Sequence, residues 1–327
     1  MREIPIIICL DVEPAEREID SAVPKGWEGF EETVQYFSEI RPRLEVATGA
    51  RANFSWFFRM DPQIEHTYGL SWWVVKRYGE AIQRLELAGD EIGLHTHAWR
   101  WDAGTHKWVI DHGDQEWINH CIHTSFKAYR SAFGRQCLSL RFGDRWMNNE
   151  TMALLESLGV KFDLTVEPGK KARRGLHRRE LHTGSLPDYT ATPRWPYRPS
   201  RHDFRKHSPE QGRGLWAIPL STQQVLGRFA GLKRAAMAFG IFQRRYEACQ
   251  LNLCLEGPLF RLMVNRLLDR PTKSYLAPVA RTEIGICPIA RANMERNVNF
   301  LLSHPLVKRF RFVRPAEAIE LSDSRCA

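Results

Sequence analysis

Short apolar runs recur along the chain and are separated by longer segments with the apolar spacing of helices. This alternation is typical of repeated β-α units around a parallel sheet or barrel, because parallel strands need a helix-length crossover between them. Eight runs qualify as candidate strands, at residues 4–11, 52–58, 90–97, 137–142, 161–166, 214–221, 274–281 and 309–313. We therefore expect an α/β fold, a (β/α) barrel of seven or eight strands.

Helical patterns fill the spaces between these runs. Residues 73–89 and 148–159 both carry an apolar stripe at helical spacing, and each segment ends at a glycine that can close a helix. In the second segment, Asn148 or Asn149 can cap the first turn.

Two segments interrupt the alternation of strands and helices. A chain of 327 residues suits one large domain, and residues 168–213, rich in Pro, Gly, His and Arg, resemble a long basic loop inserted into it. Residues from about 223 to 270 are basic with interleaved apolar side chains, which predicts a helical segment. We expect this segment to pack on the barrel with a solvated cationic face, and a helix lying on a membrane surface is the alternative.

The formal charge of +9 favours anionic partners, such as an acidic glycan, a membrane surface or a nucleic acid. No zinc-finger, helix-turn-helix or RNA-binding motif occurs, so we expect no nucleic-acid partner.

The seven cysteines form no C-x-x-C pair, which argues against a thiolate zinc site and favours reduced thiols. The apolar run near the N-terminus is too short for a transmembrane segment and has no cleavage signal, which predicts a cytoplasmic protein.

Two carboxylates close the first candidate strand. Asp11 and Glu13 follow the apolar run "IIICL", and residues at positions i and i+2 of a strand point to the same face. Active sites of (β/α) barrels lie at this carboxyl end of the strands, although acids here also cap following helices.

Two histidines repeat this spacing at the end of the third candidate strand. His95 and His97, in "EIGLHTHAW", are again at i and i+2. Two imidazoles and one carboxylate form the usual three-ligand site of a catalytic zinc ion, with one position open for water. Glu13 has the longer side chain and is the expected ligand, which leaves Asp11 as the expected base.

A third strand end, in "LRFGDRW", adds the remaining candidates. Arg141 can orient the base carboxylate or bind an acidic sugar, and a plain surface salt bridge is the alternative. Because sugar rings stack on indoles, Trp99 and Trp146 are the tryptophans expected to line a carbohydrate cleft, with Asp144 beside them as a further substrate contact.

Taken in order, these segments resemble the polysaccharide deacetylases of the NodB-homology type, carbohydrate esterases built on a distorted (β/α) barrel. "CLDVEP" resembles the first motif of that family, "EIGLHTHAW" its histidine motif and "LRFGDRW" its arginine motif. The resemblance extends to "ETMALLESLGVKFDLTVEPG" and to the closing pattern "NVNFLLSHP…FRFVRPAEA", so it runs along most of the chain.

The resemblance implies a divalent metal, expected to be Zn²⁺, and hydrolysis of an N-acetyl group on a glycan or sugar precursor. It implies Asp11 as base, Glu13 and His95 as ligands, and Arg141 as the group that orients the base. Two departures stand out: Trp99 occupies the place of the family's second histidine, so that His97 must serve instead, and no late acid histidine occurs near residues 274–286.

Three functions thus remain open from the sequence. The first is a carbohydrate deacetylase whose substrate is anionic or linked to a lipid or nucleotide. The second is a carbohydrate-binding protein with a degenerate site. The third is a hydrolase of other C–N bonds outside peptides, because a fold does not fix a substrate.

Overall fold

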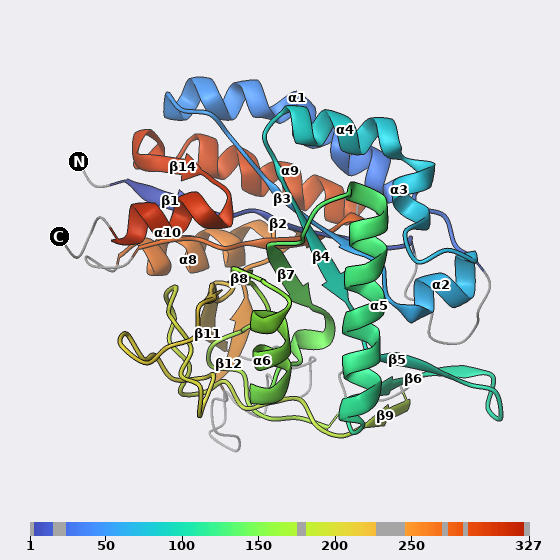
Figure 1. The fold of residues 1–327 in the computed structure, drawn as a ribbon. Helices are drawn as coiled ribbons and strands as arrows, with labels where there is room; N and C mark the ends of the chain where they lie inside the picture. Colours follow the sequence, from blue (N-terminus) through green and yellow to red (C-terminus); the bar gives the residue numbers. More distant parts are fainter. Residues whose placement is uncertain are drawn as a thin grey trace, which may run out of the picture.

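The computed structural model describes residues 3–15, 24–174, 181–226, 246–269, 274–283 and 287–323. Its centre is a seven-stranded parallel sheet with the order β10-β8-β7-β4-β3-β2-β13 (Figure 1). The strands are β2 (Cys9–Val12), β3 (Ser55–Arg59), β4 (Glu91–Thr96), β7 (Ser139–Phe142), β8 (Phe162–Asp163), β10 (Trp216–Ala217) and β13 (Val279–Arg281). Seven of the eight candidate runs therefore contribute strands to this sheet.

The two edges of the sheet meet through irregular hydrogen bonds. Ser221, beyond β10, donates its backbone N–H to the carbonyl oxygen of Ala277, just before β13, at 3.1 Å. The backbone N–H of Ala277 in turn donates to the Ser221 hydroxyl at 2.9 Å. These contacts confirm the expected distorted (β/α) barrel.

The first and last candidate runs behave differently from the expectation. Residues 4–11 form two strands, because β1 (Ile4–Ile6) pairs in parallel with β14 (Phe310–Phe312) before the chain changes partner and enters β2. The last run therefore pairs with β1 in a separate two-stranded sheet and does not join the central sheet.

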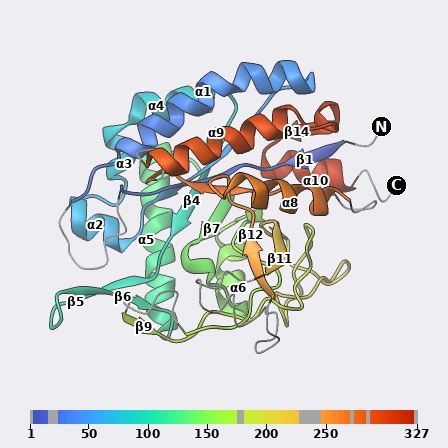
Figure 2. The ribbon, with the colours of Figure 1, turned by 180° about the vertical axis from the view of Figure 1, so that it is seen from behind.

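Helices surround the sheet. They are α1 (Glu28–Thr48), α2 (Pro62–Tyr68), α3 (Trp73–Arg77), α4 (Gly79–Leu87), α5 (Gln115–Phe133), α6 (Asn149–Ser157), α8 (Gly257–Leu268), α9 (Pro288–Leu302) and α10 (Pro315–Asp323). Seen from behind, α9 lies between α1 and α8 (Figure 2). None of the described helices has the length and apolarity needed to cross a membrane.

The local signals at helix ends are mostly confirmed. Asn148 caps α6 by accepting a hydrogen bond from the Thr151 N–H at 2.7 Å, and Gly159 closes that segment with a φ of 82°. The helix expected over 73–89 is instead two helices, α3 and α4. The chain leaves helical geometry at Tyr78, whose ring packs edge-on against Phe30 at 5.6 Å.

Two apolar layers hold the barrel. The larger one fills the space between the sheet and the helices, and the smaller one fills the barrel interior around Cys9, Phe57 and Val279. Gly93 of β4 belongs to the interior face, because a Cβ there would lie 2.7 Å from the Phe57 ring. The interior of the barrel is therefore filled by apolar side chains, and the charged side chains described below lie at its carboxyl end.

The segment expected to be helical between about 223 and 270 is only partly so. Its ends form an antiparallel pair, β11 (Thr222–Leu226) with β12 (Tyr246–Gln250), and only α8 is helical, while residues 227–245 lie outside the described residues. The prediction was wrong for the two strands, because their paired residues are 20 to 28 positions apart and give no local signal.

A second small sheet lies beside the carboxyl end of the barrel. It has the order β5-β6-β9, with β5 (Trp99–Asp102), β6 (Lys107–Asp111) and β9 (Leu181–Thr183). The last of these strands comes from the expected basic loop at 168–213, so this loop folds back onto the segment that follows β4.

Candidate metal centre and active site

Charged side chains gather where several barrel strands end. In the register of the sheet, Arg281 of β13 lies opposite Asp11 of β2, and His95 of β4 lies opposite both Arg59 of β3 and Arg141 of β7. The arrows of β4 and β7 point toward the part of the molecule that holds β5, β6 and α6 (Figure 1). The carboxyl end of the barrel is thus the polar end, as expected for this architecture.

Asp11 and Arg141 meet across the barrel. Their strands are separated in the sheet by β3 and β4, so a flat sheet would place them about 14 Å apart at the usual strand spacing. The Arg141 Nε–H nevertheless donates to Oδ1 of Asp11 at 2.8 Å and to Oδ2 at 3.1 Å, which requires the sheet to curve. Both side chains are buried, and Nη1 of Arg141 has no partner among the described residues.

His95 is fixed by a backbone carbonyl. Its Nδ1 lies 2.7 Å from the carbonyl oxygen of Arg141, and because a carbonyl can only accept, Nδ1 carries the hydrogen. In the neutral ring the Nε2 atom then presents a bare lone pair. It faces Oε1 of Glu13 at 3.3 Å and Nε2 of His97 at 3.0 Å.

His97 is fixed in the same tautomer by a carboxylate. Its Nδ1 lies 3.1 Å from Oδ2 of Asp144, and its backbone N–H donates to Oδ2 of Asp61 at 3.1 Å. Burial lowers the pKa of His97, and the nearby Arg59 cation lowers it further, so the neutral ring is favoured. Nε2 of His97 is then also a bare lone pair, aimed at Nε2 of His95.

Glu13 is held by a residue that the sequence analysis did not select. Its Oε2 accepts a hydrogen bond from Nη2 of Arg281 at 2.7 Å, which leaves Oε1 toward His95. Burial acts to raise the pKa of Glu13, but the Arg281 cation is the largest opposing influence, and the net effect holds that pKa well below its ordinary value. The signal in the sequence was the position of Arg281 at the end of a candidate strand.

The late acid histidine of the resembled family has no counterpart in the described part of the chain at the tip of β13. The tip of β13 carries Arg281 in that region. His304 lies after α9, where its Nε2 is 3.3 Å from Oδ1 of Asn265 and its ring packs against Phe300 and Phe310. It belongs to the outer layer of the fold and not to this site.

A short turn after β7 positions His97. Gly143 lies against the imidazole, because a Cβ there would be 2.4 Å from Nε2 of His97. The next two residues, Asp144 and Arg145, both have a φ of 53°, a left-handed conformation that is uncommon outside glycine. This strained turn delivers the Asp144 carboxylate to the histidine.

Asp144 and Trp99 were expected to contact substrate, and the structure places them differently. Oδ2 of Asp144 accepts hydrogen bonds from Nδ1 of His97 and, at 2.8 Å, from Nε1 of Trp99. With 1% of its surface exposed, Trp99 has no face to offer a sugar ring. Asp144 therefore orients His97, and Trp99 in turn holds the Asp144 carboxylate, because the buried indole N–H needs an acceptor.

Trp146 is also largely covered. Its ring stacks on His112 at 5.4 Å and packs against Phe142 at 5.6 Å, and 4% of the residue is exposed. A cleft-lining role for this indole therefore has no support in the geometry.

His112, missed by the sequence analysis, forms a second histidine pair with His182 of β9 at 5.2 Å. Neither ring nitrogen of either residue has a hydrogen-bond partner among the described residues. Burial lowers the pKa of His112 to about 3, so its ring is neutral near pH 7.

The donor set fits a divalent metal ion. One carboxylate oxygen of Glu13 and one ring nitrogen each of His95 and His97 lie within 4.8 Å of one another, and all three residues are buried. Tetrahedral zinc at about 2.0–2.1 Å from its ligands separates them by roughly 3.3–3.5 Å, close to the spacing of the facing atoms here. In the neutral tautomers described above, two lone pairs face each other at 3.0 Å, and a cation between them and the carboxylate would remove their repulsion.

Comparison with known proteins bears on the fold. No family model matches the chain, and no curated protein matches it. Among solved structures, it is similar to a Parabacteroides distasonis protein assigned as a glycoside hydrolase/deacetylase, with 12% identity, a TM-score of 0.58, and coverage of 99% of this chain and 71% of that one.

Two further solved structures cover nearly the whole chain. The Puue allantoinase aligns with 14% identity and a TM-score of 0.51, covering 98% of this chain and 90% of that one. A protein assigned as a polysaccharide deacetylase from Mycobacterium smegmatis aligns with 13% identity and a TM-score of 0.48, covering 99% and 91%. The chain therefore has the NodB-like fold of the polysaccharide deacetylases, a distorted (β/α) barrel whose sheet contains seven strands.

Proposed function

We propose that the protein is a metal-dependent hydrolase that removes N-acetyl or similar acyl groups from a glycan or sugar precursor. The observation that carries the proposal is the convergence of two bare imidazole nitrogens, 3.0 Å apart, beside the Glu13 carboxylate. Each ring is committed to this orientation by a hydrogen bond at its other nitrogen, as metal-binding histidines are. Zn²⁺ is the proposed ion, because this set of nitrogen and oxygen donors suits it.

In this proposal Glu13, His95 and His97 hold the ion. When bound, a divalent cation lowers the pKa of water and polarises the scissile carbonyl group. Asp11 accepts the proton that the attacking water loses. Arg141 fixes both oxygens of Asp11 and balances its charge in a buried position, so the base does not have to be reoriented during the reaction.

The leaving nitrogen also needs a proton. Because β13 ends in Arg281 and His304 lies elsewhere, we propose that Asp11 returns to the nitrogen the proton that it took from water. Protons then balance within one residue: one is accepted as the C–O bond forms, and one is delivered as the C–N bond breaks.

Hydrolysis of another C–N bond outside peptides is the second candidate. One of the structural neighbours is an allantoinase, and the other two are assigned as deacetylases, so the fold alone accommodates both kinds of amide. The arrangement of base, guanidinium and proposed ligands serves either reaction, because both begin with attack of water on an amide carbonyl.

The test combines metal content with turnover. Wild type, His95→Ala and Asp11→Asn are loaded with zinc, dialysed and analysed for metal, and each is assayed with N-acetylated glucosamine oligomers and with a cyclic ureide. We expect about one zinc per chain in wild type and Asp11→Asn, and a loss of zinc in His95→Ala. Turnover should fall at least about 100-fold in Asp11→Asn, judged from what a positioned base supplies.

The outcomes separate the candidate functions. A wild-type chain that holds no zinc, and that binds glucosamine oligomers without cleaving them, identifies a carbohydrate-binding protein and overturns the hydrolase. Cleavage of the ureide but not of the oligomers assigns the site to the second candidate.

A further inference from the structure

A cavity rich in cationic side chains lies beside the proposed metal centre. It has a volume of about 550 Å³, and we call it the basic pocket. Its lining comes from the turn after β7, from residues 169–173, from Thr190 and Arg194, and from the β11-β12 pair. The lining residues that carry charge are Arg145, Lys170, Lys171, Arg173, Arg194 and Glu247.

The charge of this lining is strongly one-sided. Five of its side chains are cationic, and Glu247 is the one carboxylate among the lining residues. Arg145 is 8% exposed, and its Nη1 has no hydrogen-bond partner among the described residues. A buried guanidinium nitrogen without an acceptor is costly, so it marks the place where an anionic oxygen would bind.

Residues 169–173 and Arg194, which supply most of the positive charge of the basic pocket, are held in place by hydrogen bonds with the backbone. Residues 169–173 run antiparallel to residues 186–189: the Gly169 N–H donates to the Tyr189 carbonyl oxygen at 2.7 Å, and the Leu186 N–H donates to the carbonyl oxygen of Arg173 at 2.7 Å. Nη1 of Arg194 is anchored on the carbonyl and hydroxyl oxygens of Thr222, at 2.9 and 3.0 Å. A pocket formed in advance loses less conformational entropy when a ligand binds.

Gly169 is needed for this arrangement. Its φ is 85°, and a Cβ there would lie 2.7 Å from Nη2 of Arg194. A side chain at this position would strain the backbone and displace the Arg194 guanidinium from its place beside it.

The basic pocket and the metal centre share one structural element. Asp144 supports His97, and the next residue, Arg145, lines the pocket. The hydroxyl of Tyr189 fixes this turn by donating to the carbonyl oxygen of Arg145 at 2.8 Å. A ligand that contacts Arg145 in the pocket would thus contact the neighbour of Asp144, the residue that orients His97.

We propose that the basic pocket binds a phosphate group of the substrate, as a phosphate monoester or a diphosphate. Glu247 offsets one of the five cations and Glu167 pairs with Lys170 at 3.7 Å, but the remaining positive charge still exceeds what one carboxylate of an acidic sugar would neutralise. A phosphate offers several oxygens and more than one charge to planar guanidinium groups. The role of this phosphate as part of a substrate rests on the proposed hydrolase function. Binding of phosphate by the pocket does not depend on that function.

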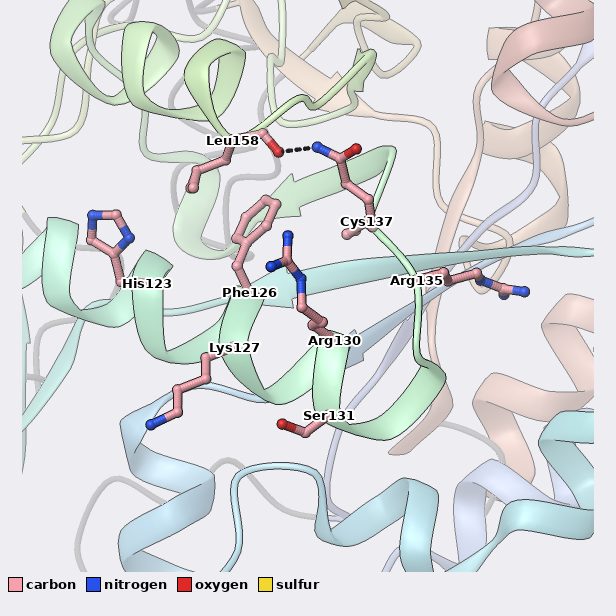
Figure 3. A pocket seen from close by; sticks show the side chains of 9 residues that line it. His123, Phe126, Lys127, Arg130, Ser131, Arg135, Cys137 and Leu158 are labelled. Carbon is pink, nitrogen blue, oxygen red and sulfur yellow. Dashed lines mark hydrogen bonds between the residues drawn. The ribbon is translucent and has the colours of Figure 1, made fainter.

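The chain offers a matched control at a second basic hollow. This hollow has a volume of about 350 Å³ and lies along α5. Its lining includes His123, Lys127, Arg130 and Arg135, and the Arg130 guanidinium lies beside the Phe126 ring (Figure 3). It includes Cys137, which precedes β7, so it belongs to the amino end of the strands, opposite the metal centre. Lys127 and Arg130 carry the same two charges as Lys171 and Arg173.

The experiment measures binding of pyrophosphate to the full chain by calorimetry at low ionic strength. Lys171→Ala/Arg173→Ala should weaken binding about tenfold or more, because each charged hydrogen bond to the anion contributes substantially. Lys127→Ala/Arg130→Ala removes the same charge and should change the dissociation constant less than about twofold. Equal losses in the two double variants, or no pyrophosphate binding by wild type, would overturn the proposal.

Two further arms identify the source of the phosphate. N-acetylglucosamine 1-phosphate is titrated as a soluble sugar phosphate, and vesicles of phosphatidylcholine with and without phosphatidylglycerol are tested by flotation. Binding of the sugar phosphate that Lys171→Ala/Arg173→Ala weakens supports a soluble substrate. Flotation only with phosphatidylglycerol vesicles, lost in the same variant, supports a lipid-linked phosphate. Zinc content is measured in parallel, so loss of the metal site is distinguished from loss of the pocket.

Discussion

The support that Asp144 gives to His97 can be tested by three substitutions at one position. Asp144→Ala removes the acceptor for both Nδ1 of His97 and Nε1 of Trp99. Asp144→Asn can keep an oxygen in the same place. Asp144→Gly removes the side chain but suits the left-handed backbone, where φ is 53°, better than alanine does.

The expected magnitudes follow from these contacts. Loss of a residue that orients a metal-binding histidine typically weakens metal affinity 10–100-fold, which is about 1.4–2.7 kcal/mol. In Asp144→Ala, the Trp99 N–H and the His97 Nδ1–H are left buried without an acceptor, which should lower the free energy of unfolding by roughly 2 kcal/mol or more. Asp144→Gly should lose zinc affinity by the same factor while avoiding the backbone strain of Asp144→Ala.

Zinc affinity is measured by competition with a chelator, and stability by urea unfolding of the metal-free protein. Trp99→Phe is the control, because it removes the other donor to Asp144 and leaves the contact with His97 in place. Zinc affinity that is unchanged in folded Asp144→Ala and Asp144→Gly would refute the reasoning, as would an equal loss in Trp99→Phe.

Two further predictions concern the surroundings of the site. Gly143→Ala should displace the His97 ring, because the new methyl group would lie 2.4 Å from Nε2. Competition with a chelator should then show zinc binding at least about tenfold weaker than in wild type. An unchanged zinc affinity would contradict the close approach of Gly143 to His97. His112→Phe keeps a ring against Trp146 but removes a titrating group whose pKa is lowered to about 3 by burial. The pKa of histidine in the unfolded chain is near 6.5, so below this pH the unfolded wild-type chain binds a proton that the folded chain does not. As the pH is lowered from 6 to 4, the free energy of unfolding of wild type should therefore fall by about 1.4 kcal/mol per pH unit more than that of the variant. If the free energy of unfolding depends on pH equally in the two proteins over this range, His112 is not buried in its neutral form.

Local patterns predicted the strands and the residues at their ends. Asp11, Glu13, His95 and Arg141 lie at the carboxyl end of the barrel because parallel strands share one polarity and the i, i+2 spacing keeps side chains on one face. This reasoning depends only on the chain direction and the strand period. It therefore held without any knowledge of which strands were neighbours.

Contacts between distant strands could not be predicted in the same way. The pairing of Glu13 with Arg281 joins residues 268 positions apart and depends on β13 being the neighbour of β2. The role of Asp144 depends on consecutive left-handed residues that are not glycine, which propensity disfavours. Trp99 could not be assigned to the interior because an indole suits a sugar cleft and a buried hydrogen bond equally well.

The turn at Gly143–Arg145 shows why these unpredicted features belong together. Two successive residues at a φ of 53° are each destabilised by roughly 1–2 kcal/mol relative to ordinary conformations. The hydrogen bonds of Asp144 to His97 and Trp99, and that of Tyr189 to Arg145, offset this strain within the folded chain. A glycine at either position would relax the backbone but would remove a side chain that faces either the proposed metal ligand or the basic pocket. The conformation is therefore explained by the two side chains that it positions, Asp144 against His97 and Arg145 in the lining of the basic pocket.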